Sequence, residues 1–499
     1  MEAAAQSRRW TLIAVCATTF MLLVDITIVN VALPSIQRQL HAGLTGLQWV
    51  VDAYAITLAA IILTAGALAD RYGRRFIFAI GVAVFSGASA LCGAAWSIGA
   101  LDVARAVQGL GGAALFATAL ALIGAEYQGA ERAGAIAVWG ATVGLAVAAG
   151  PLVGGIITDS LSWRWIFFVN VPVGAFALAL ALTKMRESRD PNATRTDVRG
   201  LLTFSASLVL LVLGLLRGNN AGWSSWQILA SLIGGALLLV VFVVIEERQE
   251  RPMLDISLFH RAPFVGVQLA TFCIGCGMFA LFPFLSIYLQ DVLGNSPLGA
   301  GLRFLPITAF VFVVPIATRK VATRVPMWAL IALSLAIVAL GLLLLEAISP
   351  GSKWTALLAG FIVTGVGIGL ANPTIAAAAL RVVDPARTGM AAGISNTARI
   401  TGLAVGVAGL GAFLQNRVGQ RLAAAGYAGK HIAAAVSSSG LRAAGADPAL
   451  RHAADVAFVS GLRLVFLVGF AVVAVGALAG LVLVRRPVET PAPALEPAP

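Results

Sequence analysis

Asp25 is the residue whose type and position point most directly to chemistry. It lies in the continuous apolar run 11–33, about fifteen residues after Trp10. A helix rises about 1.5 Å per residue, so the carboxyl group lies about 22 Å along its axis, within a hydrocarbon layer about 30 Å thick. A carboxylate there costs at least about 2.5 kcal/mol. We expect Asp25 to take up and release protons as its access to water alternates; a structural charge locked to a partner is the alternative.

Arg105 is a second ionisable residue within an apolar run, 99–124. If the helices alternate in direction from a cytoplasmic N-terminus, Arg105 lies about 9 Å from the outer face, close to the depth of Asp25. An ion pair between the two residues is therefore geometrically possible. A partner for Arg105 is expected, because an unpaired arginine is expensive at this depth.

Further polar residues in the apolar runs are candidates for contact with a substrate. Asp52 lies in the first turns of the run 47–68. Its carboxylate either recognises a cationic substrate or is solvated at a helix end, where a negative charge suits the helix dipole. Arg399, in the run 389–414, is a further charge placed inside the membrane. The candidate substrate-binding residues are Asp52, Trp49, Tyr54, Asn30 and Arg399.

The segment GALADRYGRR, residues 66–75, joins the second and third apolar runs. Gly73 permits a tight turn, because glycine has no Cβ. Asp70 could cap a neighbouring helix, and the arginines could pair with Glu126 or Glu131. Contacts that close one side of a transporter and break to open it form a gate. The predicted cytoplasmic gate comprises Gly66, Asp70, Arg71, Gly73, Arg74 and Arg75.

The composition argues against a soluble enzyme. Of the 499 residues, 59% are hydrophobic and only 11% are charged, whereas soluble domains carry about 25% charged residues. The sequence has no P-loop, no H-E-x-x-H and no Ser/His/Asp constellation. We therefore expect no enzymatic activity, metal or cofactor, and a proton gradient as the energy source. The net charge of +12 is assigned to cytoplasmic loops rather than to a nucleic-acid surface.

Fourteen apolar runs predict an all-α integral membrane protein with fourteen transmembrane helices. With the N-terminus inside the cell, 21 of the 34 Lys and Arg residues fall on inside segments and four on the short outside loops. This bias favours cytoplasmic N- and C-termini. The runs are 11–33, 47–68, 76–97, 99–124, 134–158, 164–183, 200–217, 226–245, 263–289, 299–318, 327–346, 355–378, 389–414 and 462–484.

The fifth run contains a proline among small residues: Gly150, Pro151, Gly154 and Gly155. A proline inside a helix removes a backbone donor and bends the helix. Small residues allow neighbouring helices to approach closely. We therefore expect a bent helix with close helix contacts.

These stretches together resemble the Major Facilitator Superfamily, and in particular its fourteen-helix branch of drug:proton antiporters. GALADRYGRR resembles the signature loop of that family, and LDVARAVQG (101–109) resembles its helix 4 motif. The Gly-Pro pair with the following Gly-Gly resembles the antiporter motif, which is typical of exporters. VDITIVNVALP (24–34), WRWIFFVNVPVG (163–174) and QDVLG (290–294) are similar to segments of the same branch.

The resemblance implies two six-helix bundles that rock around a central site, with two inserted helices at 200–217 and 226–245. It assigns proton coupling to Asp25 and Arg105, and it assigns the gate and the antiporter motif to the residues given above. The expected division is a cytoplasmic N-terminus (1–10), an N-terminal bundle (11–183), a linker with the inserted helices (184–262) and a C-terminal bundle (263–484), followed by a disordered cytoplasmic tail (485–499). The C-terminal bundle includes an extracytoplasmic loop (415–461), which we expect to be partly helical because it is rich in alanine.

The expected function is proton-coupled export of amphiphilic drugs or antibiotics by alternating access. An exporter dedicated to one endogenous metabolite is the alternative, and a nutrient symporter is a weaker one. The expected partners are a small amphiphilic substrate, protons and the lipid bilayer, with no nucleic acid. We expect a monomer in the inner (plasma) membrane, with a periplasmic adaptor if the host has an outer membrane.

Overall fold

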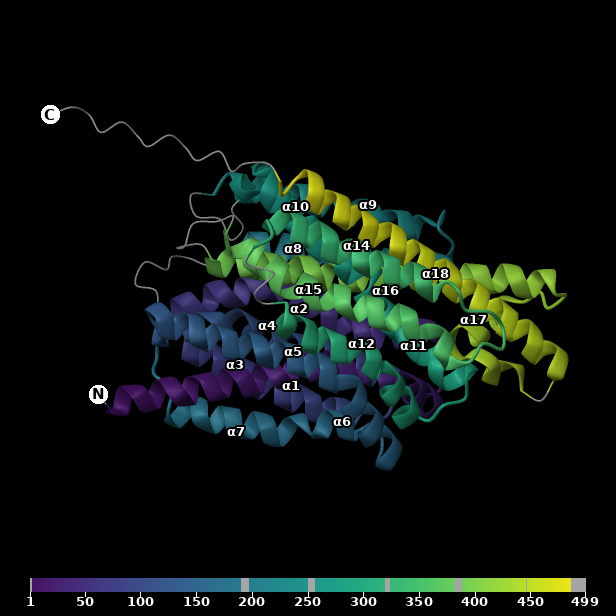
Figure 1. Cartoon of the computed structure of the whole chain (residues 1–499), viewed down its shortest axis with the longest axis horizontal. Coiled ribbons are helices and arrows are strands. Elements are labelled where there is room, and N and C mark those ends of the chain that lie inside the picture. The colour runs from purple at the N-terminus through teal and green to yellow at the C-terminus, as the bar shows by residue number, and fades with distance from the viewer. Residues whose placement is uncertain are drawn as a thin grey trace.

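The computed structural model describes residues 2–189, 197–249, 256–318, 324–381, 388–445 and 447–485. Within these ranges every regular element is a helix, as the fold class predicted. The long helices run side by side, and α1 begins at the end of the bundle where α18 ends (Figure 1). Most of the predicted tail, 486–499, lies outside the described residues, as do 190–196 and 250–255 of the predicted linker.

The N-terminal half and the inserted pair contain nine helices within the described part of the chain. Those of the half are α1 (Glu2–Leu40), α2 (Leu44–Tyr72), α3 (Arg74–Gly93), α4 (Ile98–Glu126), α5 (Gly129–Ser160), α6 (Trp165–Phe168) and α7 (Asn170–Thr183). The inserted pair is α8 (Val198–Ala221) and α9 (Trp226–Glu247). α8 packs against both α2 and α16, so the pair touches both halves.

The C-terminal half contains further long helices, some of them interrupted by short turns. The helices are α10 (Ala262–Gly277), α11 (Phe282–Ile287), α12 (Pro297–Ala317), α14 (Met327–Leu345), α15 (Leu358–Arg381), α16 (Thr388–Ala424), α17 (Lys430–Ser439) and α18 (Pro448–Val482). A π-helical turn, Tyr288–Val292, follows α11, and a 3-10 turn, Gly440–Ala444, follows α17. Further 3-10 turns are Ile256–His260, Phe279–Leu281 and Trp354–Leu357.

The predicted spans agree with the helices. Thirteen segments of the described chain are long and apolar enough to cross a membrane, and the bent helix α5 makes a fourteenth. In α5 the segments Gly134–Ala146 and Ala149–Ser160 meet at 44°. Pro151 explains this bend, because its ring nitrogen cannot donate to the carbonyl four residues earlier.

Helix ends follow local chemistry that the sequence carries. Gly73 joins α2 to α3 with a φ of 123°, a left-handed conformation that glycine adopts without strain. Ser97 caps α4, Ser296 caps α12 and Asp447 caps α18, each by accepting a bond from a backbone N–H in the first turn. A proline follows the caps of α12 and α18, where its missing donor costs nothing.

The predicted loop 415–461 is partly helical, as expected from its alanine content. α16 continues to Ala424, α18 already begins at Pro448, and α17 lies between them. These parts project beyond the neighbouring helices at the end remote from the N-terminus (Figure 1). The helices form because the segment is rich in alanine, which has the highest helix propensity, and because α17 packs against α16.

Candidate functional site

Asp25 is the centre of a buried polar cluster in the N-terminal half. Its side chain has no exposed surface. It accepts hydrogen bonds from Arg105 Nη1 at 2.5 Å, from Gln108 Nε2 at 2.9 Å and from Asn170 Nδ2 at 3.2 Å. Ser89 Oγ accepts bonds from the same two amides, at 3.2 and 3.0 Å. Residues of α1, α3, α4 and α7 therefore form one polar cluster around the carboxylate of Asp25.

The guanidinium of Arg105 contacts residues of α1, α2 and α4. Its Nε donates to the carbonyl of Val50 at 3.0 Å, and Nη1 also donates to Gln108 Oε1 at 2.7 Å. The guanidinium lies 4.2 Å from the centre of the Tyr54 ring, a distance at which a cation is attracted by the ring face. The partner expected for Arg105 is thus Asp25, which confirms the ion pair that the matched depths allowed.

Gln108 and Asn170 were not among the predicted site residues. Both belong to quoted motifs, Gln108 to LDVARAVQG and Asn170 to WRWIFFVNVPVG. Gln108 follows Arg105 by three residues, so both lie on one face of α4. The sequence could have indicated both residues, because each is a polar amide within an apolar run and such a group needs a buried partner.

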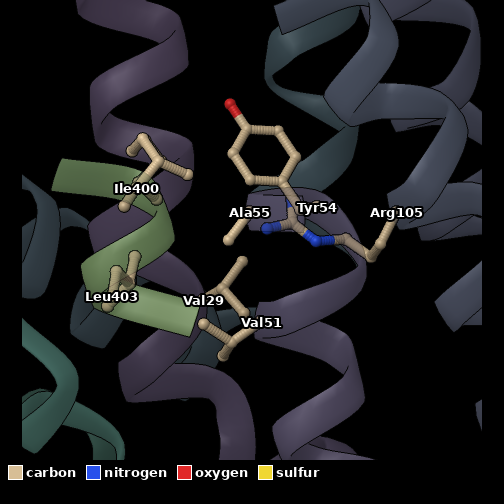
Figure 2. Close-up of a pocket in the computed structure, with 8 residues that line it drawn as sticks. Val29, Val51, Tyr54, Ala55, Arg105, Ile400 and Leu403 are labelled. Carbon is tan, nitrogen blue, oxygen red and sulfur yellow. The ribbon is translucent and has the colours of Figure 1, made fainter. Parts of the chain in front are cut away.

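A small cavity adjoins this cluster between the two halves. Its volume is about 10 Å³, about the space that one water molecule needs. Ile400 and Leu403 of α16 face Arg105 and Tyr54 across it (Figure 2). The lining residues are Ile26, Val29, Val51, Tyr54, Ala55, Arg105, Ile400 and Leu403. The cavity is too small for a drug-sized molecule, so binding one there requires the halves to move apart.

The other predicted substrate residues are spread around this centre. Asp52 is completely buried, and neither of its oxygens has a hydrogen-bond partner in the described chain. The alternative of a solvated helix end is therefore wrong, because α16 and α8 pack against α2. Asn30 donates to Ile26 O within its own helix at 3.2 Å. Trp49 and Arg399 are half-buried.

Sequence comparison places this architecture in a family. The profile of the Major Facilitator Superfamily matches residues 15–407. This chain belongs to the Major Facilitator Superfamily. The Multidrug resistance protein Stp of Mycobacterium tuberculosis (strain CDC 1551 / Oshkosh) is 37% identical, over 96% of this chain and 93% of that protein. The Tetracenomycin C resistance and export protein of Streptomyces glaucescens is 33% identical, over 98% and 95%.

A solved structure has the same fold. A bacterial homologue of the human lysosomal transporter Spinster, in an inward-facing and occupied conformation, superposes with a TM-score of 0.66 at 17% identity. The match covers 96% of this chain and 97% of that one. The protein is thus a multi-pass membrane transporter of the Major Facilitator Superfamily rather than an enzyme.

The predicted gate turn of this superfamily member has a different partner from those expected. Glu187, which follows α7, accepts bonds from the backbone N–H of Arg75 and Phe76, at 3.0 and 3.1 Å. It therefore caps α3, a role the sequence offered to Asp70. Asp70 instead pairs with Arg74 at 2.8 Å, one turn away. Arg71 lies over the ring of Tyr72, and Gly66 lies near Ala117.

Glu126 and Glu131, the acids expected to meet these arginines, have other partners. Arg8 donates to Glu131 at 3.0 Å, and Ser7 donates to Glu126 at 3.3 Å. The reason is that α1 starts earlier than the first apolar run, so its first turns reach the α4–α5 connection. The Tyr127 hydroxyl donates to Arg8 O there.

The antiporter motif presents two faces of α5. A Cβ on Gly154 would lie 2.7 Å from a side-chain atom of Ile28, and Gly150 packs on Thr27, so these glycines face α1. A Cβ on Gly155 would lie 2.8 Å from Pro297 O and 3.0 Å from Leu298 Cα, on α12. Gly301 of α12 packs on Pro151 in return. One face thus packs within the N-terminal half, and the other forms a seam with the C-terminal half.

Polar contacts also join the two halves at the end remote from the N-terminus. Gln48 donates to Val407 O at 2.9 Å, and Gln290 donates to Val31 O at 2.7 Å. Asp291, whose side chain is 1% exposed, lies 3.6 Å from Arg38 of α1 and 3.1 Å from Arg442. We call Asp291, Arg38 and Arg442 the remote triad. It connects both halves with the segment 415–461.

Proposed function

We propose that this transporter is a proton-coupled exporter of amphiphilic small molecules that works by alternating access. The observation that supports it best is the buried Asp25–Arg105 pair beside a cavity between the two halves. Ionisable groups inside a membrane are costly and mark proton or substrate pathways. The names of the relatives, which contain "multidrug resistance" and "resistance and export", support drugs or antibiotics as the substrate class.

The proposed orientation places both termini in the cytoplasm, with the chain acting as a monomer in the inner (plasma) membrane. The excess of Lys and Arg on the predicted inside segments supports this orientation. α1 begins and α18 ends at one end of the bundle, which supports a common side of the membrane for both termini (Figure 1). A periplasmic adaptor is proposed only for a host with an outer membrane.

In the proposed cycle, a proton entering from outside neutralises Asp25. Neutral Asp25 no longer attracts Arg105 electrostatically, and the cluster around it rearranges. Release of the substrate to the outside is coupled to this step, and the neutral form favours return to the inward-open state. Release of the proton to the cytoplasm restores the pair and completes the cycle.

A dedicated exporter of one endogenous compound is the second candidate. The relative from Streptomyces glaucescens supports it, because its name couples resistance with export of a single antibiotic. Both candidates use the same proton site, so a substrate screen separates them. The Gly150–Pro151 stretch, typical of exporters, weighs against a nutrient symporter.

Transport in inverted vesicles tests the proposal. We expect wild-type protein to accumulate a fluorescent amphiphile, offered both as a lipophilic cation and as a carboxylate, only while a proton gradient is present. Asp25→Asn keeps the side-chain size but cannot be protonated, so gradient-driven accumulation should vanish. Asp159→Asn, at an exposed acid of α5, is the matched control and should transport normally. An uncoupler should abolish wild-type uptake, and uphill accumulation by Asp25→Asn would contradict the assignment.

The remote triad is expected to hold the outer side closed. Arg442→Ala removes the closer of the two cations from a carboxylate that is nearly inaccessible to water. The interface between the halves at the remote triad should therefore open more often. A cysteine placed at the buried Ser35 of α1 should then react several-fold faster with an impermeant maleimide added outside. Arg451→Ala, at an exposed arginine of α18, is the control. Unchanged labelling in Arg442→Ala would remove the triad from the gate.

A further inference from the structure

A second polar group lies in the C-terminal half, where α10 and α16 pack closely. A Cβ on Gly402 would lie 3.1 Å from the carbonyl carbon of Phe272 and 3.2 Å from Cys276 N. Ser395, Arg399 and Gly402 are three or four residues apart, so they share one face of α16. Gln268 precedes Phe272 by one turn and lies on the face of α10 that meets α16. The contact between α10 and α16 therefore brings Gln268, Ser395 and Arg399 to one region.

These three side chains lack partners in the part of the chain that the structure describes. Gln268 is 6% exposed, and neither Oε1 nor Nε2 has a hydrogen-bond partner. Ser395 Oγ is likewise buried and unpartnered. The guanidinium of Arg399 makes no ion pair or hydrogen bond with the described residues. Buried polar groups in folded proteins almost always have partners, so the unpartnered Gln268 and Ser395 indicate an occupant.

The acids of the C-terminal half that the structure describes all have other contacts. Asp291 belongs to the remote triad, and Glu346 pairs with Arg463 at 2.7 Å. Asp447 and Asp455 accept bonds from backbone N–H groups at 2.9 and 3.1 Å. Arg399 is thus a cation within a membrane span without a counter-charge from the described residues of its own half. Arg105, a cation within a span of the N-terminal half, is already neutralised by Asp25.

The region adjoins the pathway between the halves. Ile400, the residue after Arg399, lines the cavity beside Arg105, and Leu403 lines it one turn further on (Figure 2). Arg399 is only half-buried although it lies within a predicted span. A molecule that extends from this cavity along α16 towards α10 would meet Arg399 with its polar group and Ile400 and Leu403 with its apolar body.

We propose that Arg399, with Gln268 and Ser395, binds an anionic group of the transported molecule. The guanidinium presents a planar set of donors that matches a carboxylate or phosphate, and the amide and hydroxyl add neutral donors. The substrate class is accordingly an amphiphile with one negative group, either anionic or zwitterionic. This inference rests on the proposed export function and adds the charge of its substrate.

Equilibrium binding to the purified transporter in neutral detergent tests the site. The probes are a carboxylate-bearing xanthene dye and its methyl ester, which differ in one charge. Wild type should bind the carboxylate more tightly, and Arg399→Gln should reduce that preference at least about tenfold, because a charge-assisted bond is lost. Gln268→Leu should reduce the preference less. Arg303→Gln is the matched control, since Arg303 already donates to Gly299 O at 2.8 Å.

The ratio of the two affinities is measured on one sample, so partial misfolding of a variant does not change it. Arg399→Lys, which keeps the charge but loses the planar donor set, should retain part of the preference. Equal affinities of the wild type for the two dyes would overturn the proposal. So would an equal weakening of both dyes in Arg399→Gln, which would show a structural role.

Two further comparisons separate the anion site from proton coupling and from lipid binding. Binding is measured without a gradient. Charge preference without gradient-driven transport would therefore support the anion site and contradict proton coupling. Gradient-driven transport without charge preference would support proton coupling and contradict the anion site. A lipid headgroup offers the same chemistry as a substrate phosphate. If the preference disappears in phosphatidylglycerol bilayers but persists in phosphatidylcholine, the occupant is lipid and the assignment to a substrate fails.

Discussion

Arg105→Ala is expected to abolish transport and to destabilise the N-terminal half. The change leaves the fully buried carboxylate of Asp25 without its cation. Removing one partner of a buried ion pair costs about 3–5 kcal/mol, because the remaining charge stays uncompensated. The substitution also removes the bond to Val50 O and the contact with the Tyr54 ring. Thermal unfolding of the purified protein and gradient-driven transport would be measured together.

A double variant separates the charge from the packing. If the uncompensated carboxylate causes the loss of stability, Asp25→Asn in the Arg105→Ala background should recover much of it, while transport remains absent. Arg105→Lys should be more stable than Arg105→Ala but transport poorly, since an ammonium cannot form the same set of bonds. Full transport by Arg105→Ala, or no rescue of stability in the double variant, would contradict this account of the cluster.

Gly155→Leu is expected to stop transport without unfolding the N-terminal half. A side chain at this position would meet Pro297 O and Leu298 Cα of α12, which are backbone atoms that cannot swing aside. The seam between α5 and α12 would therefore stay open. Gradient-driven transport should fall to background, while the thermal unfolding temperature stays close to that of the wild type.

Two variants on the same helix provide the comparison. A Cβ on Gly140 would meet no described atom within 4 Å, so Gly140→Leu should transport normally. Gly154→Leu would collide with Ile28 on α1, within one half, and should lower stability as well as transport. If Gly155→Leu unfolds the protein as Gly154→Leu does, the α5–α12 interface is part of the stable packing rather than one that opens during the cycle. If Gly155→Leu transports like the wild type, this interface does not need to close for transport.

The membrane architecture could be predicted because it depends on local sequence. Each span needs a continuous apolar stretch as long as the bilayer is thick, and fourteen such runs correspond to the helices of the described chain. The turn at Gly73 and the bend at Pro151 were likewise predictable, because single residues impose them through backbone geometry. Cost and depth made an ion pair between Asp25 and Arg105 possible, and the structure confirms it.

The partners that depend on packing could not be predicted in this way. Glu187 caps α3 because α7 ends beside α3, and nothing near Glu187 in the sequence indicates that position. Gln108 and Asn170 reach Asp25 because α4 and α7 both pack on α1. The bounds of the helices within 415–461 could not be predicted for a related reason. Alanine-rich sequence gives no strong apolar run, and packing against neighbours stabilises the helix.

By itself, the sequence determined that this protein is a bundle of membrane-spanning helices with a carboxyl group and a guanidinium buried at similar depth. Those properties follow from the cost of placing each residue in a hydrocarbon layer, which depends on residue type and position along a helix. The tertiary structure alone decided which helices meet, and so which amides complete the Asp25 cluster and which acid caps the gate turn. It also left Arg399 without a counter-charge among the described residues. Contacts between distant segments are set by the packing of whole helix faces, and no local pattern encodes them.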